Sequence, residues 1–74
     1  MRNFEQTIYK MSKGEKVYIN SIALTVKNIE TLKNMIKSNI LIPDKSEVEY
    51  VYKDVESVMN GDVIIPQMTY IKKQ

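Results

Sequence analysis

The hydrophobic period of this chain changes at Asn28, and that change limits the folds it can adopt. The apolar residues that follow have the spacing of one helical face. They are Ile29, Leu32, Met35 and Ile36. Asn28 is of a residue type that caps helix N-termini. The pattern predicts one main helix over about residues 29–39, with one apolar side that must pack against another element.

Segments on both sides of this helix are predicted to be strands. Lys16 to Val26 is rich in β-branched residues, and the apolar triplet at 40–42 has the length of a short buried strand. Val63 to Lys72 is also predicted to be a strand, in which Pro66 favours an edge position or a bulge because proline lacks an amide N–H. These elements indicate an α+β fold: a small mixed or antiparallel sheet of about three to four strands, with the main helix on one face and one or two short helices.

Two shorter segments have the start and stop signals of helices. The first runs from Asn3 to Lys13, with Asn3 as its cap and Gly14 at its end. The second begins after Asp54, another capping residue type, and ends at Gly61. Both helices are predicted to be short.

Residues 46–60 are compatible with two structures. Valine and tyrosine alternate with charged residues over Glu47–Lys53, which favours a strand that is followed by the short helix after Asp54. The valines of the same segment also follow a helical period. A single helix is therefore the alternative.

The composition excludes several classes of function. The chain has 74 residues with no Cys and no His, so disulfides, ordinary zinc or haem sites and the usual thiol or imidazole catalysts are all excluded. Gly14 and Gly61 are too far apart for a glycine-rich phosphate loop. We therefore expect no enzymatic activity, no cofactor and no metal site.

The length of the chain predicts a single domain over residues 1–74 and favours self-association. A chain of this size buries little apolar surface, and a second copy is a simple source of further stability. A free edge at the strand that contains Pro66 would allow a homodimer to form.

No apolar run approaches the roughly 20 residues of a membrane-spanning helix, and the first residues lack the apolar core of a signal peptide. We therefore expect a cytoplasmic protein with no membrane partner. Lysine greatly outnumbers arginine, a codon bias that favours a low-GC bacterium, or its phage or mobile element, as the source.

Charge is distributed unevenly, and residues 44–62 carry a net negative charge. Carboxylates that flank tyrosines would offer apolar contact area and would steer a basic partner toward it. The predicted partner-binding residues are Glu47, Glu49, Tyr50, Tyr52, Asp54 and Glu56. We expect a small non-enzymatic protein-interaction module, an inhibitor or modulator that binds a host macromolecule.

Two alternatives use other features of the chain. The first is a nucleic-acid-binding protein whose lysines contact phosphates, although the scarcity of arginine counts against it. Its candidate residues are Lys10, Lys13, Lys16, Lys72 and Lys73. The second is a homo-oligomer that sequesters a ligand in a pocket between its subunits.

Overall fold

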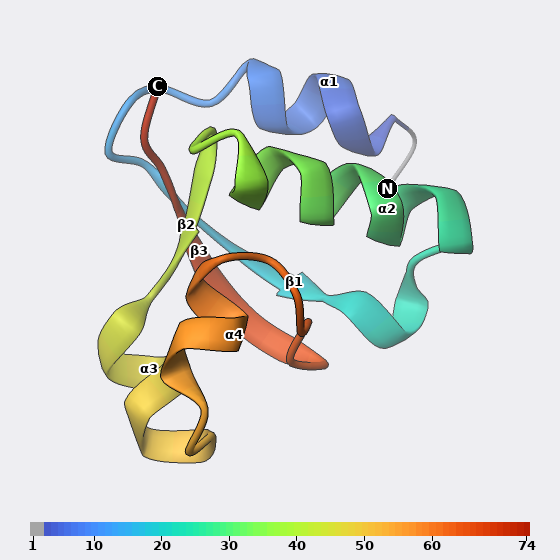
Figure 1. Cartoon of the computed structure of the whole chain (residues 1–74). Coiled ribbons are helices and arrows are strands. Elements are labelled where there is room, and N and C mark those ends of the chain that lie inside the picture. Colours follow the sequence, from blue (N-terminus) through green and yellow to red (C-terminus); the bar gives the residue numbers. More distant parts are fainter. Residues whose placement is uncertain (1–2) are drawn as a thin grey trace.

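The computed structural model describes residues 3–74 and has a three-stranded antiparallel sheet with helices packed on one face (Figure 1). The strands are β1 (Lys16–Asn20), β2 (Leu41–Pro43) and β3 (Gln67–Lys72). The helices are α1 (Phe4–Tyr9), α2 (Val26–Lys37), α3 (Lys45–Val51) and α4 (Val55–Met59), with a 3-10 turn, η1, at Ser21–Ala23. The predicted α+β fold is confirmed.

The main helix, α2, buries the predicted apolar face but starts earlier than expected. Thr25 caps it, because its hydroxyl oxygen accepts a hydrogen bond from the Asn28 amide at 3.2 Å. The predicted cap at Asn28 is therefore wrong. The helix ends before Asn39, which has a φ of 61°, and the Ile40 amide bonds back to the Met35 carbonyl at 2.9 Å. This is the hydrogen-bonding pattern of a left-handed C-terminal cap.

The first helix is shorter than predicted. Asn3 caps α1 as expected, since its side chain accepts a hydrogen bond from the Gln6 amide at 3.1 Å. The helix ends at Tyr9, however, and does not reach Lys13. Gly14 has a φ of 89° and lies in the turn that leads into β1.

β1 ends at Asn20, six residues before the predicted end at Val26. The Asn20 side chain accepts a hydrogen bond from the Ile22 amide at 3.2 Å and starts the 3-10 turn. The Ser21 amide donates to the Pro66 carbonyl at 2.7 Å. The bond from Ser21 to Pro66 continues the register of the ladder by one residue, and the cap at Asn20 turns the chain toward α2.

β3 is the central strand, which corrects the prediction for the C-terminal segment. The strand order is β1-β3-β2, and Pro66 precedes β3, so it lies neither in an edge strand nor at a bulge within one. The free edges of the sheet belong to β1 and β2. A homodimer through a free edge at Pro66 is therefore not possible.

The ambiguous segment forms two helices, so the predicted strand over Glu47–Lys53 is wrong. Asp44 initiates α3, because its carboxylate accepts hydrogen bonds from the Ser46 amide (3.1 Å) and the Ser46 hydroxyl (2.8 Å). The predicted short helix after Asp54 is confirmed as α4, and Gly61 follows its end with a φ of 86°.

The core lies between the sheet and the helices. Its fully buried apolar residues come from every strand and every α-helix: Phe4, Ile8, Ile19, Leu32, Met35, Ile36, Leu41, Val48, Val58, Met68 and Tyr70. Along β1 and β3 the buried residues alternate with residues that are exposed or half-buried. The sheet therefore has one covered face and one open face.

Candidate interaction surfaces

Two of the six predicted partner-binding residues make side-chain hydrogen bonds within the fold. Glu47 is one of them, since it is half-buried and its carboxylate accepts a hydrogen bond from the Thr69 amide at 3.3 Å. The Asp44 amide donates to the Thr69 carbonyl, but the Asp44 carbonyl accepts from Val48 as the chain enters α3. The Asp44 carbonyl is therefore not available to the Thr69 amide. The Glu47 carboxylate accepts the hydrogen bond from that amide in its place.

Asp54 also has a structural role. Its carboxylate accepts hydrogen bonds from the Ser57 hydroxyl at 2.7 Å and the Ser57 amide at 3.2 Å, which caps α4. The hydrogen bond from the Ser57 hydroxyl is the main reason why the pKa of Asp54 lies below its ordinary value of 3.8. Bonding to Ser46 lowers the pKa of Asp44 in the same way.

The other four predicted residues, which like Asp54 are exposed, make no such bond within residues 3–74 and lie at the junction of α3 and α4. Tyr50 is 89% exposed and Tyr52 is 39% exposed, and Val51 between them is 52% exposed. We call the set Glu49, Tyr50, Val51, Tyr52 and Glu56 the α3–α4 corner. It projects from the end of the molecule opposite α1 (Figure 1).

Sequence reasoning missed Val51 as part of this surface. In a strand, Val51 would point to the side opposite its two tyrosine neighbours, but α3 brings all three residues to the last turn of the helix and its cap. The capping signal Asp44-x-Ser46 could have indicated the helix.

Tyr70 lies inside the core next to the internal acidic residue. It is 1% exposed, and burial together with the negative charge of Glu47 raises the pKa of its hydroxyl to about 12. Tyr70 is therefore neutral over the physiological pH range.

The structure removes one residue from the predicted phosphate-binding set. Lys72 is 4% exposed, and its ammonium donates hydrogen bonds to the carbonyls of Ile8 (2.9 Å), Tyr9 (3.3 Å) and Met11 (3.2 Å). It points into the covered face because Met68, Tyr70 and Lys72 alternate along β3. That alternation is the sequence signal that could have revealed its burial.

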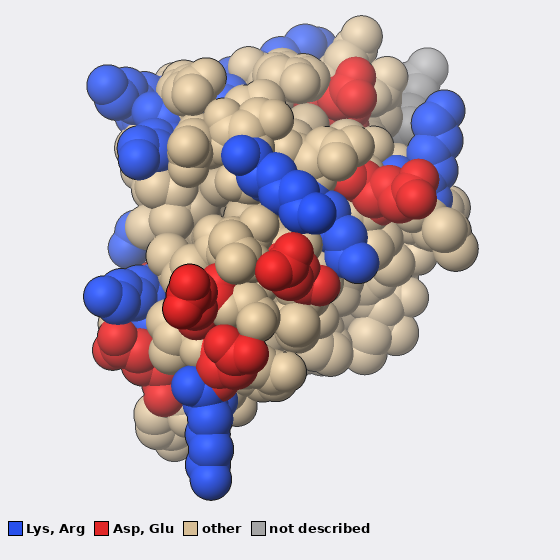
Figure 2. Space-filling model, viewed as in Figure 1, with Lys and Arg blue, Asp and Glu red and all other residues tan. Residues whose placement is uncertain are grey.

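The remaining lysines of that set are exposed: Lys10, Lys13, Lys16 and Lys73. The register places Lys16 opposite Ile71, so the start of β1 and the end of β3 bring lysines to one end of the sheet. Figure 2 shows acidic and basic side chains mixed over the face in view, without a continuous field of one sign. The exposed lysines of the predicted phosphate-binding set therefore lie toward the end of the sheet that holds the start of β1 and the end of β3.

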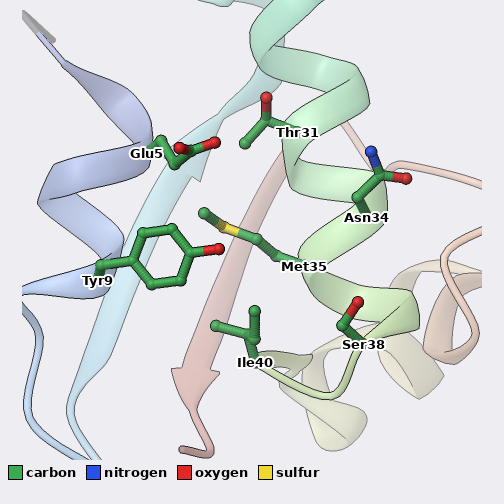
Figure 3. Close-up of a pocket in the computed structure, with 7 residues that line it drawn as sticks. All are labelled: Glu5, Tyr9, Thr31, Asn34, Met35, Ser38 and Ile40. Carbon is green, nitrogen blue, oxygen red and sulfur yellow. The ribbon is translucent and has the colours of Figure 1, made fainter.

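A small hollow lies between α1 and α2 (Figure 3). Its volume is about 110 Å³, below the roughly 300 Å³ at which ligand pockets begin. Met35 and Ile40 contribute apolar atoms, and the remaining lining residues are polar: Glu5, Tyr9, Thr31, Asn34 and Ser38. Two larger hollows, of about 420 and 320 Å³, lie along α1 and are lined mostly by polar side chains. None of these three hollows encloses a ligand-sized apolar space.

Within residues 3–74, no group of three or more acidic side chains is arranged to hold a metal ion. None of the helices in this range has the length and apolar character needed to cross a membrane. No family model, curated protein or solved structure matches this chain.

Proposed function

We propose that this protein is a small non-enzymatic interaction module that binds a partner protein through the α3–α4 corner. The observation that carries the proposal is the run Tyr50-Val51-Tyr52, whose exposed fractions are 89%, 52% and 39%. Tyrosine is one of the residue types that dominate binding energy at protein interfaces.

The surroundings of this run support a partner with a basic surface. Glu49 and Glu56 are exposed on either side of it, whereas Glu47 and Asp54 are engaged within the fold. Lys45 lies 3.9 Å from Glu49 in an exposed ion pair, which is too weak to neutralise the site. The partner in this proposal offers an apolar pocket for Tyr50, rimmed by lysine or arginine.

Binding of this kind would make the protein a stoichiometric modulator that acts by occupying a surface of its target. The proposal includes a host macromolecule as that target, and a bacterial phage or mobile element as the source. The absence of Cys and His from the sequence supports the non-enzymatic part, since the commonest nucleophile and acid–base side chains are missing.

The test is capture from a nuclease-treated lysate of a low-GC bacterium, followed by affinity measurement with the protein that is retained. Tyr50→Ala is expected to weaken binding about tenfold or more, because it removes the most exposed aromatic side chain of the corner. The double variant Glu49→Lys with Glu56→Lys is expected to weaken it further and to reverse its salt dependence. Glu47 is left unchanged, since its substitution would disturb the fold.

The matched control is the double variant Lys10→Ala with Lys13→Ala, which changes exposed residues at a different surface. Capture of one protein that depends on the corner and not on these lysines supports the proposal. Capture that is as strong with both corner variants as with the wild type contradicts it. Retention of nucleic acid from a parallel lysate without nuclease, lost in the lysine variant, would instead assign the function to the basic end of the sheet.

A further inference from the structure

Within residues 3–74, the edge of β1 that faces away from β3 pairs with no other strand. β1 pairs with β3 along five residues and has no strand on its other side. The opposite edge belongs to β2, which is three residues long, includes Pro43 and leads directly into α3. Short length and proline are two of the ways in which proteins prevent edge pairing, and β1 has neither.

The backbone of β1 presents a regular set of groups along this free edge. The hydrogen bond from the Lys72 amide to the Glu15 carbonyl (2.8 Å) shows which alternate residues on this side of the ladder bond to β3. Bonded residues alternate in an antiparallel pair, so the odd-numbered residues of β1 direct their backbone groups toward β3. The free edge therefore carries the N–H and C=O groups of Lys16, Tyr18 and Asn20.

The side chain of Tyr18 leaves this edge accessible. Its hydroxyl donates a hydrogen bond to the Gln67 side chain at 3.1 Å, which holds the ring across β3 on the open face of the sheet. Even so, Tyr18 remains 60% exposed. The ring therefore does not obstruct the approach of another strand to the edge.

We propose that a second copy of this chain occupies the edge, with the two β1 strands antiparallel about a two-fold axis at Tyr18. In this register Lys16 lies opposite Asn20 of the partner subunit, and Tyr18 lies opposite the partner's Tyr18. Each outward N–H and C=O then has a partner across the interface. No two like charges face each other, and aromatic pairs at facing positions stabilise sheets.

Symmetry favours a second copy over an open assembly. A two-fold pairing covers the free β1 edge of both copies at once. The edges that remain belong to the two β2 strands, which are short and contain proline. The result is one continuous sheet in a closed dimer. This surface lies on β1 and is separate from the α3–α4 corner, so the dimer and the proposed partner binding can be tested independently.

The experiment measures molar mass in solution by sedimentation over total concentrations from about 1 µM to about 1 mM. The wild type is expected to rise from its monomer mass of 8.6 kDa toward twice that value. Tyr18→Lys and Tyr18→Glu are each expected to remain monomeric, because each places two like charges opposite each other. An equimolar mixture of the two variants is expected to restore the dimer, since opposite charges then meet at the axis.

Tyr50→Lys is the matched control, because it puts the same charge on an exposed tyrosine outside β1 and should leave dimerisation unchanged. Amide hydrogen exchange gives the register directly. The amides of Lys16, Tyr18 and Asn20 should exchange more slowly in the dimer than in the Tyr18→Lys monomer. A wild type that stays monomeric over the whole range overturns the proposal. So does a dimer that persists in Tyr18→Lys, or a variant mixture that remains monomeric.

Discussion

The ammonium group of Lys72 donates a hydrogen bond of 2.9 Å to the carbonyl of Ile8, which lies 64 residues earlier in the chain. The carbonyls of Tyr9 and Met11 accept from the same group, so one side chain satisfies the C-terminal end of α1. A positive charge at this end also complements the helix dipole. Lys72 therefore ties the last strand to the first helix.

Replacing Lys72 with Met should destabilise the protein by about 2–3 kcal/mol, because a buried donor is lost and the carbonyls of Tyr9 and Met11 lose its hydrogen bonds. Lys73→Met is the control, since Lys73 is exposed and no hydrogen bond from its ammonium is recorded in the described residues. Urea unfolding of both variants measures the difference. Equal stabilities of the two variants would show that the contacts of Lys72 contribute nothing net.

Glu47 and Glu49 are two positions apart but should differ in their contribution to stability. Glu47→Ala removes the acceptor of the half-buried Thr69 amide and should cost about 1–2 kcal/mol. Glu49→Ala breaks only an exposed ion pair with Lys45 and should change the stability by less than about 0.5 kcal/mol. Thermal unfolding measures the loss of stability in each variant. A larger loss in Glu49→Ala than in Glu47→Ala would contradict the prediction.

Local sequence signals were sufficient for part of the fold. The apolar stripe that contains Leu32 and Ile36 predicted the main helix and its buried face. Asn3 and Asp54 predicted two helix starts, because each cap uses its own side chain and an amide three residues later. These features depend only on neighbours in the sequence.

The errors arose where distant contacts or competing local signals decide the structure. β1 ends where the Asn20 side chain accepts a hydrogen bond from the Ile22 amide and starts the 3-10 turn, a local signal that competes with the β-branched pattern of residues 16–26. The pattern over Glu47–Lys53 favours a strand although a helix also fits it, and the cap at Asp44 decides for the helix. Lys72 was predicted to be exposed because its hydrogen-bond partners near α1 lie far away in the sequence.

Tyr70 should make the protein sensitive to alkaline pH. Its pKa is raised from 10.0 to about 12 in the folded state, so the unfolded chain releases this proton first as the pH rises. The contribution of Tyr70 to stability is complete below pH 10 and falls as the pH approaches 12, by on the order of 2 kcal/mol. Urea unfolding at several alkaline pH values should show this loss in the wild type and a smaller one in Tyr70→Phe. An identical loss in both proteins would contradict the assignment.

Asp54 should act in the opposite pH range. Its native pKa lies below 3.8, so its contribution to stability is present above that pH and is lost as the pH falls through the lowered native value. Ser57→Ala removes the main cause and should move the pKa of Asp54 back toward 3.8, which NMR titration of the carboxyl carbon measures. Ser46→Ala should leave Asp54 unchanged and move only Asp44. A shift of Asp54 in the Ser46 variant would show that a different interaction controls it.

Substitutions at Gly14 and Gly61 can separate two costs of adding a side chain: the cost of a left-handed backbone and the cost of contact with neighbouring atoms. Both have a positive φ, of 89° and 86°, so alanine at either position should cost about 1–2 kcal/mol for the left-handed backbone alone. A Cβ at Gly14 would meet nothing within 4 Å, whereas one at Gly61 would lie 3.1 Å from the Lys33 carbonyl oxygen and 3.3 Å from the Ile36 side chain. Gly61→Ala should therefore destabilise the protein by about 2–4 kcal/mol, clearly more than Gly14→Ala, because α4 must move away from α2. Urea unfolding of both variants measures the gap, and equal losses would mean that the contact between Gly61 and α2 is not close in solution.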